Sequence, residues 1–238
     1  MGGGHRPEAA GGYDLSSISL PSPAELAATF DAEMRLLEVH NTATERAVCR
    51  KYTGLIRTHP SAYVLSFARQ LLFTYGHRWQ AYELIQAHKA AFRSLHADEI
   101  EELGQGIDSW WSTDAFARTL SGPAWRDGQV TDERIIQWAG SPDLWWRRAA
   151  LVSTVAFNIR SQGGKGDIPR TLTICRLLVA DHTDMVVKAL SWALRELVYF
   201  DPVAVQGFLR EHDAVLASRV EREVGSKLRT GLKNPRRN

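Results

Sequence analysis

Two stretches of the chain decide its fold: LWWRRAAL at residues 144–151 and VVKALSWAL at residues 186–194. Each places apolar residues at three- and four-residue spacing, the pattern of an amphipathic helix. The two stretches lie roughly forty residues apart, close to the period of HEAT-type helical repeats. The repeat is weak, and a chance similarity between two amphipathic helices explains it as well. The pair therefore predicts helices and suggests an α-solenoid of stacked helix pairs.

The helical pattern extends outward from these stretches over most of the chain. Ser22, Pro23 and Glu25 supply an N-cap, a proline in the first turn and an early acid, which is typical of a helix start. Alternating strand patterns are scarce, so the sequence predicts an all-α protein. Helices are expected near residues 23–39, 43–58, 61–75, 78–95, 97–105, 112–120, 131–139, 143–160, 168–180, 184–199, 202–212 and 214–230.

The two ends of the chain differ from this pattern. Residues 1–22 are rich in Gly, Pro and Ser and predict a disordered leader, residues 23–232 a single domain, and residues 233–238 a basic tail. Residues 214–238 hold seven Lys and Arg against two Glu, a net charge of +5 in a chain whose total is only +2. Such an end suits a polyanionic partner, although a solvated tail explains the charge as well.

Composition and motifs exclude several classes of protein. With 44% hydrophobic and 24% charged residues and no run of eighteen apolar residues, the chain is expected to be soluble, without a membrane span or secretory signal. Cys49 and Cys175 are too far apart in sequence to suggest a disulfide framework or zinc site, which favours a reducing, cytoplasmic location. Neither a metal-ligand motif nor a serine-nucleophile motif is present, so no cofactor is expected.

Eight tryptophans, several beside charged residues, are the unusual feature of this composition. Trp110 and Asp114 are four residues apart and share one face of a helix, whereas Trp111 is expected to pack inward. Asp114 has a second interpretation, because Ser112, Thr113 and Asp114 are all capping types and precede an apolar helix.

Cationic residues accompany the other tryptophans. Arg147 and Arg148, at the start of a strongly apolar helix, must face solvent or an anion. Lys188, Trp192 and Arg195 form a stripe at positions i, i+4 and i+7 on one helix face. Packing in the core explains the tryptophan. It explains the two cations only if their side chains extend to solvent. Together these clusters resemble an aromatic and basic groove that holds a nucleic-acid backbone.

Three spans, SWWSTDAF at 109–116, LWWRRAAL at 144–151 and KALSWALRE at 188–196, resemble the AlkD-like DNA alkylation-repair family in content and order. The resemblance covers residues 25–232. It implies a right-handed solenoid of HEAT-like antiparallel helix pairs whose concave basic face holds double-stranded DNA. It further implies a monomeric, metal-free, monofunctional glycosylase that removes cationic N3- or N7-alkylated purines, without flipping the base out of the stack.

The resemblance assigns roles to individual residues. Asp114 matches the family's catalytic aspartate, Trp110 and Trp192 its two groove tryptophans, and Arg148 the arginine three residues after Trp145. Trp111 and Thr113 depart from the acid and the small aliphatic residue usual in the family, so the alignment of Asp114 relies on Phe116. A shift of one residue would leave no catalytic carboxylate. The expected DNA contacts are Arg147, Lys188, Arg195, Lys227, Arg229 and Lys233.

Two alternatives to a repair enzyme stay open. One is a noncatalytic HEAT-like protein that binds damaged or branched DNA, and Asp114 is the residue that discriminates it from an enzyme. The other is a HEAT-like protein-binding scaffold, which predicts a groove rich in hydrophobic and mixed-charge residues instead of cations beside tryptophan.

Overall fold

The computed structural model describes residues 21–234, and within that range every regular element is a helix. The prediction of an all-α protein is therefore confirmed. The helices are α1 (Pro23–Arg35), α2 (Thr42–Ile56), α3 (Ser61–Arg69), η2 (Gln70–Thr74), α4 (Arg78–Ala87), α5 (Lys89–Ser94), α6 (Ala97–Gly104), α7 (Trp110–Phe116), η3 (Ala117–Ser121), α8 (Gly122–Arg126), α9 (Asp132–Ala139), α10 (Leu144–Asn158), η4 (Arg160–Gln162), α11 (Ile168–Leu177), α12 (Asp184–Leu197), α13 (Pro202–Glu211) and α14 (Ser218–Thr230).

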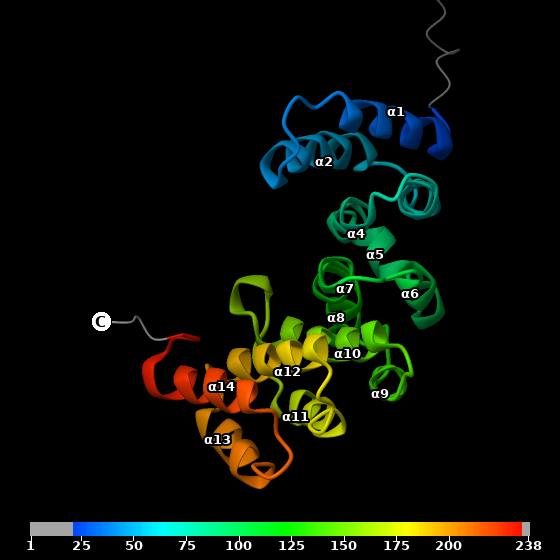
Figure 1. Cartoon of the computed structure of the whole chain (residues 1–238). Coiled ribbons are helices and arrows are strands. Elements are labelled where there is room, and N and C mark those ends of the chain that lie inside the picture. The colour runs from blue at the N-terminus through cyan, green and yellow to red at the C-terminus, as the bar shows by residue number, and fades with distance from the viewer. Residues whose placement is uncertain (1–20, 235–238) are drawn as a thin grey trace, which may run out of the picture.

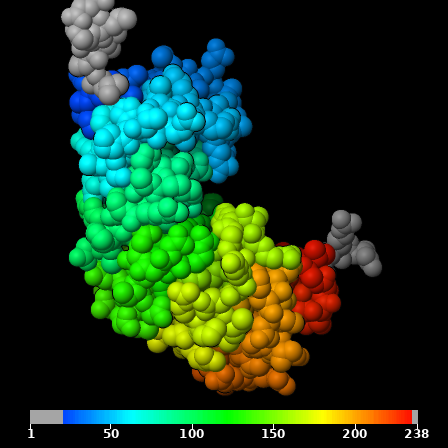
Figure 2. Space-filling model, turned by 180° about the vertical axis from the view of Figure 1, so that it is seen from behind, coloured from blue at the N-terminus to red at the C-terminus, as the bar shows by residue number. Residues whose placement is uncertain are grey.

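The helices follow one another along an arc from α1 to α14 (Figure 1). The space-filling view from behind shows the same curved outline, hollowed between the N-terminal helices in blue and the C-terminal helices in orange and red (Figure 2). The right-handed superhelix of HEAT-like pairs stays a prediction.

The helix starts follow the capping residues in the sequence. The hydroxyl of Ser22 accepts from the backbone N–H of Glu25 at 3.3 Å, and the Glu25 carboxylate accepts from the backbone N–H of Ser22 at 2.7 Å. Asn41 closes a similar box at α2, and Asp143 and Asp201 cap α10 and α13. These contacts satisfy backbone N–H groups that a helix leaves unpaired at its start.

The core is centred on α10, which packs against α7, α8, α9, α11 and α12. Every residue of α10 from Arg148 to Asn158 is buried. Beside it, the ring of Trp146 lies 4.8 Å from Trp138 and 5.8 Å from Phe116, measured between centroids. This aromatic cluster fixes α7 against α10 and thus sets the position of the residues that precede Phe116.

Several helices differ from their predicted bounds. The helix expected at 78–95 is broken at His88, whose Nδ1 accepts from the backbone N–H of Ala91 and starts a new helix. Residues 70–74 and 117–121 form π-helical turns, and α8 at 122–126 was not predicted. α14 begins at Ser218 and not at residue 214. These deviations depend on local capping and tertiary packing, which apolar periodicity does not encode.

Two further expectations concern thiols and membranes. Cys49 and Cys175 are buried free thiols, and burial raises the pKa of both, that of Cys49 to about 12. None of the helices between residues 21 and 234 has the length and apolar character needed to cross a membrane.

The predicted leader and tail fall largely outside the described residues. Residues 1–20 and 235–238 are not described, whereas the carbonyl of Pro21 accepts from the Tyr63 hydroxyl at 2.6 Å. At the other end, Gly231 adopts a left-handed conformation (φ 73°) that ends α14. The chain then turns back, and the Ser226 hydroxyl donates to the carbonyl of Leu232 at 2.9 Å.

Removal of residues 234–238 is expected to leave the melting temperature unchanged, because the apolar periodicity ends near Leu232 and the last side-chain contacts within residues 21–234 involve Leu232 and Lys233. The Lys233 ammonium lies 3.4 Å from the buried carboxylate of Glu223. A longer truncation after Gly231 should therefore lower the melting temperature. Thermal unfolding followed by circular dichroism compares the two, and a drop with the shorter truncation alone would contradict this account.

Candidate functional site

Helix α7 presents Trp110 and Asp114 without using either as a cap. Ser109 is the N-cap, and its hydroxyl accepts from the backbone N–H of Ser112 at 3.4 Å. Asp114 lies in the second turn, where its carboxylate has no terminal N–H to accept from. The capping interpretation of Asp114 is therefore wrong.

A groove of about 480 Å³ opens beside this helix. We call it the tryptophan groove, because four indole rings line it. Its lining residues come from α2, α4, α7, η3 and α12: Thr42, Arg46, Trp79, Glu83, Trp110, Trp111, Asp114, Ala115, Arg118, Thr119 and Trp192. Helix α2 lies toward the N-terminal end of the arc and α12 toward its C-terminal end (Figure 1), and both contribute residues to the groove.

The structure thus brings together three of the predicted residues, Trp110, Asp114 and Trp192, in one groove. Trp110 is 58% exposed. Trp111 is 46% exposed and also lines the groove, so the expectation that it packs inward is wrong. The indoles that pack against Phe116 of α7 are instead those of Trp138 and Trp146.

Arg148 holds Asp114 from behind the groove wall. Its Nε donates to Oδ1 of Asp114 and its Nη2 to Oδ2, both at 2.9 Å, in a bidentate pair. Nη1 of Arg148 donates to the carbonyl of Met185, which ties α10 to the start of α12. The Arg148 side chain is only 6% exposed, whereas that of Asp114 is 18% exposed toward the groove.

Burial raises the pKa of Asp114 above its usual value, and the guanidinium groups of Arg148 and Arg118 offset part of that rise. A carboxylate has two oxygens with about four lone-pair sites, so accepting two bonds from Arg148 leaves capacity toward the groove. The arrangement can therefore present an oriented negative charge to a ligand that lies between the tryptophans.

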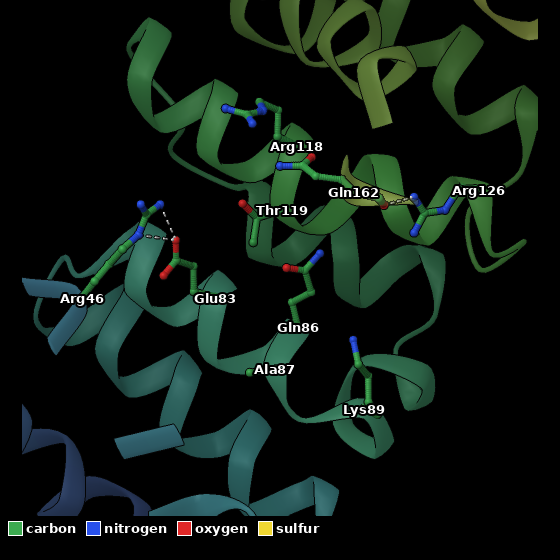
Figure 3. Close-up of a pocket in the computed structure, with 9 residues that line it drawn as sticks. All are labelled: Arg46, Glu83, Gln86, Ala87, Lys89, Arg118, Thr119, Arg126 and Gln162. Atoms are coloured by element: carbon green, nitrogen blue, oxygen red, sulfur yellow. Dashed lines mark hydrogen bonds and ion pairs between the residues drawn. The ribbon is translucent and has the colours of Figure 1, made fainter. Parts of the chain in front are cut away.

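A second hollow, the basic chamber, adjoins the tryptophan groove and shares Arg46, Glu83, Arg118 and Thr119 with it. Lys89, Arg126, Gln86, Ala87 and Gln162 complete its lining, so four cations face one carboxylate. In Figure 3, Arg46 pairs with Glu83 on one side, and Arg126 reaches the main chain of Gln162 on the other. The Arg46–Glu83 distance is 2.9 Å, and Lys89 is exposed.

The predicted cations of α10 and α12 are paired with acids or backbone carbonyls. Arg147 donates to Asp181 at 2.8 Å and to two backbone carbonyls, and Lys188 lies 2.7 Å from Asp184. Arg195 is largely buried, where its Nε donates to the carbonyl of Ser191, and burial lowers its pKa. None of these three cations lines the groove or the chamber, so the stripe expected on α12 contributes only Trp192.

The C-terminal cations form a separate group. The ammonium of Lys227 donates to the Tyr199 hydroxyl at 2.6 Å and to the carbonyl of Gly231, and Lys233 faces Glu223. Arg229 packs beside Gly225. Their contact with DNA stays a prediction.

Sequence reasoning missed four groove residues, Arg46, Trp79, Glu83 and Arg118. A signal existed for Arg118, since Trp110, Asp114 and Arg118 repeat every four residues on one helix face. Arg46 and Trp79 belong to α2 and α4, and only the tertiary fold brings them to α7; the Arg46 Cζ atom lies 5.7 Å from the ring centroid of Trp79.

No group of three or more His, Cys, Asp or Glu side chains within residues 21–234 is arranged to hold a metal ion. A search of curated proteins gives no match. The sequence model of a family described as DNA alkylation repair enzyme matches residues 18–228, which include all of α1 to α13 and most of α14. The chain therefore belongs to the DNA alkylation repair enzyme family, whose role is the repair of DNA.

Proposed function

We propose that the chain is a monomeric DNA glycosylase that removes cationic N3- or N7-alkylated purines from double-stranded DNA. The observation that carries the proposal is the carboxylate of Asp114, held by Arg148 at the wall of a groove with four tryptophans.

The chemistry suits a cationic leaving group. When the bond between C1′ and the base nitrogen breaks, its electrons neutralise the departing purine and the deoxyribose becomes an oxocarbenium-like cation. The negative charge of Asp114 stabilises that cation and orients the water that adds to C1′ with loss of a proton. The faces of Trp110 and Trp192 attract the cationic base or sugar by about 0.5–2 kcal/mol each.

The basic chamber supports DNA as the ligand. Its cations lie next to the tryptophan groove, where the phosphates of the lesion strand would pass. The four cations of the chamber favour DNA over a protein-binding scaffold, whereas the tryptophan groove itself holds two cations, Arg46 and Arg118, and two acids, Glu83 and Asp114. Lys227, Arg229 and Lys233 are proposed to reach phosphates farther along the duplex.

A noncatalytic DNA-binding protein is the second candidate. It is favoured by one observation: both oxygens of Asp114 already accept hydrogen bonds from Arg148, as in a purely structural ion pair. Release of 7-methylguanine from alkylated duplex DNA, measured beside a titration of DNA binding, separates the two. Excision supports the glycosylase, whereas binding without excision supports the second candidate.

Affinity for duplex DNA is expected to fall steeply with salt, with a log–log slope of about −0.9 for each phosphate contacted. Lys89→Gln should make the slope shallower by about one contact, since Lys89 is exposed in the basic chamber. Lys51→Gln is the matched control, because the Lys51 ammonium is exposed but lies 2.6 Å from Glu33 outside both hollows. Fluorescence anisotropy at several salt concentrations measures this, and equal slopes for wild type and Lys89→Gln would contradict the chamber's role.

A further inference from the structure

Arg118 separates the tryptophan groove from the basic chamber. It lies on the π-helical turn η3, one turn after Asp114, and lines both hollows. Its Cζ atom is 5.5 Å from the centroid of the Trp192 ring, within the range of a cation–π contact. An internal cation therefore occupies the aromatic face that the proposed chemistry requires for its ligand.

The guanidinium of Arg118 is otherwise unpaired. In the described part of the chain it forms no ion pair and no hydrogen bond, and its Nε is buried without a partner. Asp114, whose pKa the charge of Arg118 helps to lower, already accepts from Arg148 with both oxygens. A buried donor without an acceptor costs free energy, so Arg118 is ready to move to any acceptor that enters.

The basic chamber provides a place for that acceptor. Gln86, Lys89 and Arg126 line it together with Arg118 (Figure 3). Cations gathered in one hollow repel each other unless an anion lies between them. A phosphodiester is such an anion, and a guanidinium binds it through two parallel N–H donors.

We propose that Arg118 is a specificity-determining residue: it covers Trp192 against free cationic nucleosides and uncovers it when a phosphodiester enters the basic chamber. The proposal rests on the proposed function, in which Trp192 receives the cationic nucleotide. Its consequence is that a cationic purine is accepted as part of a DNA strand and rejected as a monomer. Binding of a phosphodiester in the basic chamber and of a cationic base on the Trp192 ring are thereby coupled through the Arg118 side chain.

Binding of 1-methyladenosine, whose ring is cationic at neutral pH, tests the first half of the proposal. Arg118→Gln is expected to bind this nucleoside about tenfold more tightly than wild type, because the Trp192 face is vacated and one positive charge is removed. Affinity for neutral adenosine should not increase in this way. Isothermal titration calorimetry measures both ligands.

Matched variants locate the effect. Adding Trp192→Leu to Arg118→Gln should abolish the gain, whereas Lys51→Gln, which removes a cation outside both hollows, should give none. Since Arg118 makes no hydrogen bond within residues 21–234, Arg118→Gln is expected to fold normally, which circular dichroism checks.

Arg118→Gln should have the opposite effect on the affinity for DNA. Arg118→Gln is expected to weaken binding of undamaged duplex DNA and to make its salt slope shallower by about 0.9. Unchanged or weaker binding of 1-methyladenosine, or no measurable binding to either protein, would overturn the proposal, as would an unchanged salt slope. These readouts need no excision, so a protein without glycosylase activity would refute the proposed function and leave the role of Arg118 to be decided by binding.

Discussion

Asp114→Asn is expected to lower excision of cationic alkylpurines on the order of 10- to 1000-fold. Asparagine keeps the size and one acceptor oxygen of aspartate but supplies no negative charge to an oxocarbenium-like sugar. The lower end of this range reflects the substrate, since a charged purine departs with limited assistance. Single-turnover release of 7-methylguanine from duplex DNA measures the effect without a contribution from product release.

The same substitution is expected to destabilise the protein, by about 3 kcal/mol, because it leaves the buried guanidinium of Arg148 without its carboxylate. Excision must therefore be compared at a temperature where both proteins are folded. Asp181→Asn is the matched control. Asp181 accepts from Arg147, the neighbour of Arg148 on α10, at 2.8 Å. Asp181→Asn therefore removes a comparable carboxylate, but Asp181 does not line the groove.

The two aspartate variants distinguish catalysis from structure. Asp181→Asn should retain excision, although it too loses an ion pair at the start of α10. Equal excision by wild type and Asp114→Asn would remove Asp114 from the mechanism. Loss of excision in both variants would show that the integrity of α10, and not the charge of Asp114, controls activity.

The helical fold could be predicted because its signals are local. Ser22, Pro23 and Glu25 form the start of α1 that their types predict, and residues 144–151 begin the central helix, in which Ala149, Ala150 and Leu151 are buried. The break at His88 and the π-helical turn at 117–121 could not be predicted in this way. They depend on a side-chain acceptor and on helix packing, and neither changes the apolar period.

The candidate site was only partly predictable for a similar reason. The four-residue spacing places Trp110 and Asp114 on one face, and the structure agrees. Arg147 and Arg148 are adjacent and alike in sequence, yet about 100° of helical rotation directs one to Asp181 and the other to Asp114. Which carboxylate each meets is decided by α7, which carries Asp114, and by the connection between α11 and α12, which carries Asp181. Because asparagine caps helices about as well as aspartate, the sequence predicts that Asp114→Asn leaves stability nearly unchanged, whereas the pair with Arg148 predicts a loss.

Arg148→Met should have the largest effect on stability, about 3–5 kcal/mol of unfolding free energy, because it leaves the Asp114 carboxylate buried without a counterion. Arg147→Met is the matched control: its pair with Asp181 is more exposed, so a smaller loss is expected. Chemical denaturation measures both variants.

Arg148→Met also predicts a change in pH dependence. The Arg148 guanidinium lowers the pKa of Asp114 against the raising effect of burial, so its removal raises that pKa further. The carboxylate acts only when ionised, and activity is lost as pH falls through its pKa. The acid limb of the pH–rate profile should therefore move to higher pH in Arg148→Met and stay in place in Arg147→Met.

A double substitution tests whether the two side chains act as one unit. Arg148→Met combined with Asp114→Leu removes both buried charges together, so the double variant should be more stable than Arg148→Met alone, although it lacks the catalytic carboxylate. Two independent residues would instead give additive losses, within about 0.5 kcal/mol. Additive losses would mean that Arg148 does not hold Asp114. The pH–rate profile of Arg148→Met would then not be expected to shift. A non-additive result would tie the stability of α10 to the same ion pair that keeps the carboxylate charged at the groove.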